Sequence, residues 1–217
     1  EGRLLSTFDH PQIVKVFEIG ETPSHTYIAM EFLSGGTLRE YLECNHPLSI
    51  ETIKKYVLQI CAGLSEVHKN NIIHRDLKTG NIMLDEHGTI RIMDFGLSKS
   101  PLVTTMTTLG SVLGTLGYVA PEQVTSVNVD QRTDIFSLGV IMYELLTKEM
   151  PFKGENEIAL IHSIFNTIPA LPSSLRKEIG NEWDEIVMKC LQKDIEQRFA
   201  NVEEVKNKIL NCSACFL

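Results

Sequence analysis

The chain has 217 residues, 43% of them hydrophobic, which is enough for one large domain, or a domain with a fragment, around a buried core. Its formal net charge of -8 at pH 7 excludes an overall attraction to nucleic acid or to an anionic membrane. An ordinary soluble protein is the simplest interpretation, and a local acidic patch for basic peptides is the alternative. No uninterrupted apolar run reaches the roughly 18 residues that span a bilayer, so we expect no membrane span.

The five cysteines suggest no disulfide framework, because their number is odd and their spacing is irregular. Cys212 and Cys215 form a C-x-x-C pair, but no second pair lies near enough in sequence to complete a structural zinc site. We interpret the cysteines as incidental thiols, with a metal or lipid role as the minor alternative. Reduced thiols and the lack of an export signal favour a cytoplasmic or nuclear location.

The first elements in chain order are a short helix, two strands and a second short helix. The first helix ends at His10-Pro11, because the residue before a proline avoids the helical conformation. Apolar and β-branched residues predict strands at 13–19 and 26–32. Thr37 is then expected to cap a helix that runs through Leu42.

A strong amphipathic helix follows, with Ser49 as its N-cap and Asn70-Asn71 at its end. Its apolar positions recur at steps of three and four residues: Ile53, Val57, Ile60, Cys61, Leu64, Val67 and His68. Short apolar pieces at 72–73, 82–84 and 90–93 come next, and they are too brief for helices.

The segment 97–119 is rich in Ser, Thr and Gly and has no apolar period, so we expect a functional loop. A helix apolar on nearly all sides, and hence buried, is predicted after it. Its apolar positions are Ile135, Leu138, Val140, Ile141, Leu145 and Leu146. Helices are also predicted near 158–165, 182–191 and 202–210. Strands first and helices after indicate an α+β fold with two unequal lobes.

Three short strings stand in order along the chain: HRDLKTGN at 74–81, DFG at 94–96 and APE at 120–122. Each is weak alone, since a triplet such as DFG can occur in any turn. Together, in this order and spacing, they resemble the signature of eukaryotic-type serine/threonine protein kinase catalytic domains. The resemblance runs from Glu1 to about Leu210.

This resemblance implies a two-lobed protein-kinase-like fold, with a partial small β lobe and a complete, mainly helical large lobe. We expect a remnant of the small lobe at 1–33, with the end of its helix, two strands and the start of the hinge. The large lobe is expected at 34–211 and a tail at 212–217.

The resemblance also implies a reaction, the transfer of the γ-phosphate of ATP to a Ser or Thr hydroxyl of a protein, with Mg²⁺ as cofactor. Such catalysis depends on positioning and charge neutralisation. Asp76 is then the carboxylate that orients the acceptor hydroxyl and takes its proton, and Lys78 steadies the phosphate. Asn81 and Asp94 supply oxygen ligands to Mg²⁺. A solvated loop residue is the alternative interpretation of each charge.

Seven further matches to the family imply structural roles. His74 and Phe95 correspond to core residues that join the two lobes. The rest of this apolar stack is Leu5 and Val16. Glu122 and Arg198 match a buried ion pair, and Asp134 matches a carboxylate that accepts hydrogen bonds from the backbone of the catalytic loop.

Thr115 matches the threonine of the family's substrate-docking loop, and together with Lys78 it favours serine/threonine over tyrosine acceptors. Arg75 precedes Asp76, as is typical of kinases that an activating kinase switches on by phosphorylating the long loop. Ser111 best matches the phosphorylated position, and a loop that is merely flexible is the alternative. The other candidates are Thr104, Thr105, Thr107 and Thr108.

Five residues match positions that surround the nucleotide in the family. Glu31 and Leu33 correspond to the hinge, which contacts adenine through backbone groups, and Met83 lies beneath the adenine ring. Glu1 matches the helix glutamate that pairs with the phosphate-binding lysine. Met30 corresponds to the residue that guards the back of the adenine pocket.

The sequence contains neither the Gly-rich loop nor the lysine-bearing strand of a complete kinase domain. We therefore expect a fragment, rather than a natural short form, that is weakly active or inactive alone. A non-catalytic kinase-like interaction module is the alternative function. The retained Asp76, Asn81 and Asp94 favour the enzyme, and nothing in the sequence indicates an oligomeric state.

Overall fold

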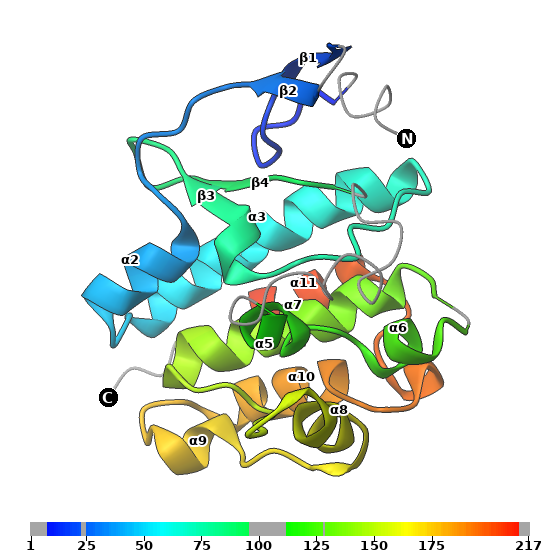
Figure 1. Ribbon diagram of the computed structural model, residues 1–217. Coiled ribbons are helices and arrows are strands. Elements are labelled where there is room, and N and C mark those ends of the chain that lie inside the picture. The colour runs from blue at the N-terminus through cyan, green and yellow to red at the C-terminus, as the bar shows by residue number, and fades with distance from the viewer. Residues whose placement is uncertain (1–7, 23–24, 96–111, 128, 213–217) are drawn as a thin grey trace.

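The computed structural model describes residues 8–22, 25–95, 112–127 and 129–212, and their architecture is α+β. Figure 1 shows a small antiparallel sheet at the top, a second small sheet beside a long helix below it with a shorter helix at its left, and most of the remaining helices at the bottom. Strands precede most of the helices in the chain, which confirms the predicted order.

The upper sheet is an antiparallel hairpin of β1 (Val16–Glu21) and β2 (Thr26–Met30). The predicted strands, 13–19 and 26–32, were wrong at three of their four ends. The second strand stops early because the chain leaves the sheet after Met30, and the side chain of Phe32 is 90% exposed.

The first strand begins late because the residues before it pair with the lower sheet instead. The Val14 amide donates to the Ile92 carbonyl at 2.9 Å, and the Ile92 amide donates to the Gln12 carbonyl at 2.9 Å. Ile13 forms a parallel bridge with Ile92. These long-range bonds join the two sheets, and no local sequence pattern could reveal them.

The lower sheet pairs β3 (Ile82–Leu84) with β4 (Ile90–Ile92), and α3 (Ile50–Lys69) packs against β4. The predicted N-cap of α3 is confirmed, since the Ser49 hydroxyl accepts a hydrogen bond from the Thr52 amide at 3.1 Å.

The helix α2 (Leu38–Asn45) lies between the upper sheet and α3 in the chain. Its predicted cap is also confirmed, because Thr37 and Glu40 form a capping box. The predicted end of this helix, Leu42, is three residues too early.

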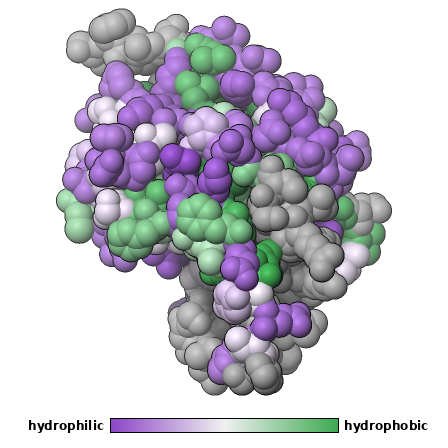
Figure 2. Space-filling view, turned by 90° about the horizontal axis from the view of Figure 1, so that it is seen from above, coloured by the Kyte–Doolittle hydropathy of each residue, from purple (hydrophilic) through white to green (hydrophobic). Residues whose placement is uncertain are grey.

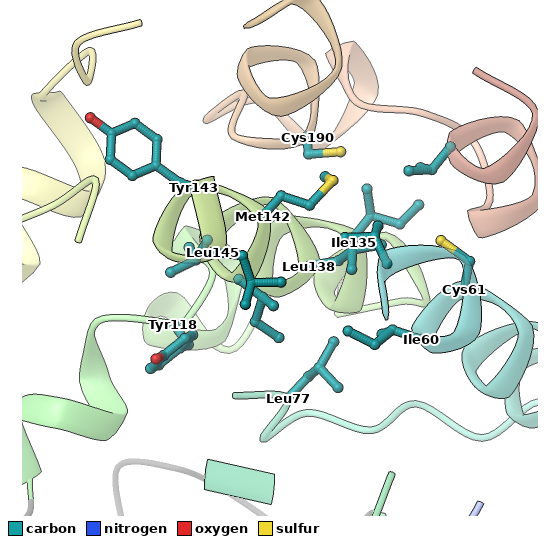
Figure 3. Packing of buried hydrophobic residues seen from close by; sticks show 14 of the residues in the cluster. Ile60, Cys61, Leu77, Tyr118, Ile135, Leu138, Met142, Tyr143, Leu145 and Cys190 are labelled. Carbon is teal, nitrogen blue, oxygen red and sulfur yellow. The ribbon is translucent and has the colours of Figure 1, made fainter. Parts of the chain in front are cut away.

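The helix α7 (Arg132–Thr147) is buried on nearly all sides, which confirms the prediction from its apolar pattern. Figure 3 shows Leu138 and Met142 of this helix close to Ile60 of α3 and to Cys190 of α10. The remaining described helices are α8 (Glu157–Asn166), α9 (Pro172–Leu175), α10 (Asn181–Cys190), the 3₁₀ turn η3 (Ile195–Gln197) and α11 (Val202–Leu210).

The prediction of a single loop at 97–119 was wrong for the last residues of that range. The short helix α5 (Val112–Leu116) forms there and packs against α8, and α6 (Pro121–Thr125) follows it. Tertiary contacts stabilise such short turns, so helical periodicity could not predict them. The rest of the predicted loop, 96–111, lies outside the described residues.

The thiols of Cys44, Cys61 and Cys190 are free. Burial raises the pKa of Cys61 to about 12, so this thiol stays protonated at neutral pH. Cys215 of the C-x-x-C pair is not described. In the described part of the chain, no group of three His, Cys, Asp or Glu residues could hold a metal ion.

The surface is mainly hydrophilic on the face seen in Figure 2, with smaller apolar patches between the polar groups. None of the described helices is both long enough and apolar enough to cross a membrane.

Candidate active site

The helix α7 holds the start of segment 74–81 through one buried carboxylate. Asp134 accepts hydrogen bonds from the backbone amides of His74 at 2.8 Å and Arg75 at 2.9 Å. It also accepts one from the ring Nε2 of His68 at 2.8 Å. Burial acts to raise the pKa of Asp134, but its hydrogen bonds and electrostatic interactions with His68 and His74 outweigh this effect and lower the pKa. Arg75 adopts a left-handed backbone with φ of 66°, which these bonds fix.

Asp76, Lys78, Asn81 and Thr115 form one hydrogen-bonded cluster. The Lys78 ammonium donates to the two carboxylate oxygens of Asp76 at 2.8 and 3.1 Å and to the Thr115 hydroxyl at 3.3 Å. The Asn81 amide nitrogen donates to the backbone carbonyl of Asp76 at 2.9 Å and to its side chain at 2.8 Å. The carboxylate of Asp76 is thus oriented by a cation and an amide while remaining 25% exposed to an incoming hydroxyl.

Asp94 lies beside this cluster because its neighbour Met93 forms hydrogen bonds with both ends of segment 74–81. The Met93 amide donates to the Asn81 carbonyl at 3.0 Å, and the His74 ring donates from Nε2 to the Met93 carbonyl at 3.0 Å. Burial raises the pKa of Asp94 above its ordinary value, and the negative charge of Asp76 adds to this effect. Electrostatic interactions with His74 and Lys78 act in the opposite direction but do not outweigh burial.

Asn81 and Asp94 fit a site for a hard cation. Among the described residues, the Asn81 side chain bonds only through its amide nitrogen, which leaves its carbonyl oxygen available as a ligand. Within the described residues, no hydrogen bond engages the carboxylate of Asp94. Two protein oxygens leave most of an octahedral shell to water and phosphate oxygens, which is how Mg²⁺ is bound at nucleotide sites.

The rings of His74 and Phe95 lie in contact, with their centroids 4.8 Å apart, and both side chains are buried. Burial lowers the pKa of His74, which keeps the ring neutral at physiological pH and suits it to packing rather than to proton transfer. Val16 and Phe95 line a small cavity between the upper sheet and this segment. Leu5, the fourth member of the predicted stack, is not described.

Glu122 and Arg198 form a buried pair with two parallel bonds, of 2.7 and 2.8 Å. The Thr133 hydroxyl donates to Glu122 at 2.8 Å, and Arg198 also donates to the Gln192 carbonyl at 2.8 Å. These contacts join α6, which follows α5 in the chain, to the turn after α10.

The predicted nucleotide-binding residues lie along the connection between β2 and α2 and on β3. The Glu31 side chain is engaged by other parts of the protein. It accepts a hydrogen bond from the Lys15 amide at 2.8 Å and lies 3.5 Å from the Arg91 guanidinium. No hydrogen bond among the described residues uses the Leu33 backbone. Met83 is partly exposed on β3, and its backbone forms a bridge with Thr37.

Two predicted site residues, Glu1 and Ser111, lie outside the described residues, so the structure says nothing of them. Sequence reasoning also missed four residues: His68, Thr79, Tyr118 and Glu144. His68 was counted as an apolar helix position, although its ring binds Asp134. Glu144 could have been found, because a carboxylate in a helix that is apolar on nearly all sides requires a specific partner.

Comparison with known proteins identifies the family of this chain. The family model described as the protein kinase domain matches residues 1–210. The chain is 36% identical over 213 residues to the serine/threonine-protein kinase PrkC of Bacillus subtilis, and 33% identical over 212 residues to the serine/threonine-protein kinase PknB of Mycobacterium tuberculosis. These matches cover 96% and 95% of the chain but only 32% and 34% of those proteins, so it spans about a third of their length.

The crystal structure of Rad53 residues 1–466 in complex with AMP-PNP is similar to this structure, with a TM-score of 0.79 and 28% sequence identity. The similarity covers 95% of the chain and 52% of the Rad53 chain.

Proposed function

This chain belongs to the protein kinase family, and we propose that the protein containing it transfers the γ-phosphoryl group of ATP to serine or threonine hydroxyls of protein substrates. Its fold is the predicted two-lobed α+β fold, with a small sheet over a helical large lobe. The carrying observation is the cluster in which Asp76 is oriented by Lys78 and Asn81 while Lys78 also reaches Thr115.

The proposed reaction assigns a separate task to each residue of the cluster. Asp76 accepts a hydrogen bond from the acceptor hydroxyl and takes its proton as the oxygen attacks the terminal phosphorus of ATP. Lys78, already within bonding distance of Asp76, donates to the phosphoryl group in transit. Positioning and charge neutralisation of this kind account for most of the rate enhancement in phosphoryl transfer.

Asn81 and Asp94 are the residues that would hold Mg²⁺. When bound, this cation neutralises the negative charge that collects on the phosphate oxygens. The similarity to the structure of Rad53 in complex with AMP-PNP supports a nucleotide site in the same fold. Leu33 would offer adenine its backbone groups, which no described residue engages in a hydrogen bond. Met83 would offer the ring a partly exposed apolar surface.

Control by an activating kinase also remains a proposal. The cation of Arg75, beside Asp76, supports it, since an arginine here could bind a phosphate on the long loop. The candidate position Ser111 lies outside the described residues. A phosphopeptide map of the active protein with no phosphate between 98 and 115 would contradict this control.

The test uses the full-length protein, ATP, Mg²⁺ and three peptide pools whose only hydroxyl residue is serine, threonine or tyrosine. We expect phosphate transfer to the serine and threonine pools and far less to the tyrosine pool. The Lys78 ammonium donates to the Thr115 hydroxyl at 3.3 Å, and these are the two residues whose match to the family favours serine and threonine acceptors. Transfer to none of the pools, or mainly to tyrosine, would contradict the proposal.

A further inference from the structure

Thr79 is fully buried within residues 74–81, which we call the catalytic segment, and its hydroxyl makes two contacts. Its Oγ1 lies 2.9 Å from the Tyr118 hydroxyl and donates to Glu144 Oε2 at 3.2 Å. The Tyr118 hydroxyl donates to the same carboxylate oxygen. Three segments far apart in the chain thus meet in one small polar group, and none of the roles described above uses it.

Glu144 makes this group costly to disturb. Burial raises the pKa of its carboxyl, and the hydroxyl of Tyr118, the charge of Arg39 and the hydroxyl of Thr79 offset that effect. A partly buried carboxylate needs such donors, because leaving it without a partner costs the desolvation energy of the charge. Thr79 and Tyr118 are therefore held where Glu144 requires them.

The same helix, α7, anchors the catalytic segment at two points. Asp134 binds the backbone of residues 74 and 75, and Glu144 binds the side chain of Thr79. The two carboxylates are ten positions apart on α7, or about 15 Å along its axis. Residues 76–78, which carry the predicted chemistry, lie between these two anchors.

Residues 115–118, which we call the docking segment, are held by the same helix, α7. The Ser137 hydroxyl donates to the Tyr118 carbonyl at 2.8 Å, so α7 holds both the backbone and the side chain of Tyr118. Lys78 has an extended backbone, with φ of -157° and ψ of 162°, so its side chain and that of Thr79 leave the chain in different directions. Lys78 reaches Thr115 while Thr79 reaches Tyr118, which gives two connections between the same two segments.

We propose that the Thr79 hydroxyl is a positioning group for phosphoryl transfer, which fixes Asp76 and Lys78 by tying the second half of the catalytic segment to Tyr118 and to Glu144 of α7. This inference rests on the proposed function, because it concerns the rate of that reaction. Thr79 touches neither substrate, and it acts through its neighbours.

The experiment compares Thr79→Val with Thr79→Ser in the full-length protein. Valine keeps the shape of threonine without the hydroxyl, and serine keeps the hydroxyl without the methyl group. We expect Thr79→Val to lower kcat about tenfold with the KM for ATP unchanged, since misplaced groups slow the chemical step. Thr79→Ser should restore most of kcat. Thr147→Val is the matched control, since it also removes a threonine hydroxyl, one that donates to the Tyr143 and Glu149 carbonyls at the end of α7.

A role in stability alone predicts a different pattern, in which Thr79→Val melts at a lower temperature but keeps the kcat of the parent protein. That result, or equal losses of kcat in the valine and serine variants, would overturn the inference. If Thr79→Val does not fold, Tyr118→Phe removes the partner hydroxyl, and an unchanged kcat there overturns it as well. A parent protein that transfers no phosphate contradicts the proposed function itself, which separates the two failures.

Discussion

Replacing Asp76 by asparagine in the full-length protein is expected to lower kcat by roughly a thousandfold, the scale on which a positioned general base contributes. Asparagine has the shape of aspartate and can still accept a hydrogen bond from Lys78, but it cannot take a proton. The KM for ATP should stay close to that of the parent protein, because Asp76 is assigned to the acceptor hydroxyl and not to the nucleotide. Steady-state kinetics at saturating ATP measure both quantities.

The control for this substitution is Asp9→Asn. Asp9 is 89% exposed, and its ion pair with Lys15 spans 3.7 Å. A surface pair of this kind contributes little, so kcat should not change. If Asp76→Asn keeps more than about a tenth of the parent kcat, the role of Asp76 as a general base is wrong.

Replacing Arg198 by methionine is expected to destabilise the kinase domain by about 3–5 kcal/mol, because it leaves Glu122 buried without its counter-charge. The guanidinium is fully buried and makes two bonds to Glu122 and others to backbone carbonyls, so water cannot replace it. Calorimetric melting of the full-length protein measures the loss as a lower transition temperature for this domain.

Lys206→Met gives the matched comparison, since Lys206 pairs with Glu203 at 3.3 Å on the surface. Its loss should cost no more than about 1 kcal/mol. Removing both buried charges, with Glu122→Gln added to Arg198→Met, should cost less than the single change does. Equal melting temperatures for the Arg198 and Lys206 variants would mean that the buried pair does not stabilise the domain.

Local signals in the sequence were sufficient for many elements of the fold. Ser49 and Thr37 could be identified as caps because a hydroxyl before an apolar period satisfies the free amides of a first helical turn. The helix α7 was predictable because apolar residues on all sides require burial.

Elements that depend on distant contacts could not be predicted in this way. The start of β1 is set by the pairing of residues 12–14 with Ile92, which lies far along the chain. The helix α5 is only one turn long, and Thr115 within it is bonded to Lys78 of another segment. Neither the pairing with Ile92 nor the bond from Lys78 to Thr115 can be predicted from the order of residues nearby in the sequence.

The candidate site shows the same division. The order and spacing of the three strings predicted which residues carry the chemistry, but not how they are held. The bonds from Asn81 to Asp76 and from Thr79 to Glu144 join residues whose distances the sequence does not contain. The carboxylate of Glu144, in a helix that is otherwise apolar on nearly all sides, was the visible signal of the second anchor.

The central claim is that Asp76, Asn81 and Asp94 form a single centre for phosphoryl transfer. The most direct test measures single-turnover phosphate transfer from ATP by the full-length protein and its Asp94→Asn variant, over a range of Mg²⁺ concentrations. We predict a variant that melts like the parent protein but transfers phosphate at least about a hundredfold more slowly at every Mg²⁺ concentration. A folded variant that matches the parent rate and its Mg²⁺ dependence would contradict the claim.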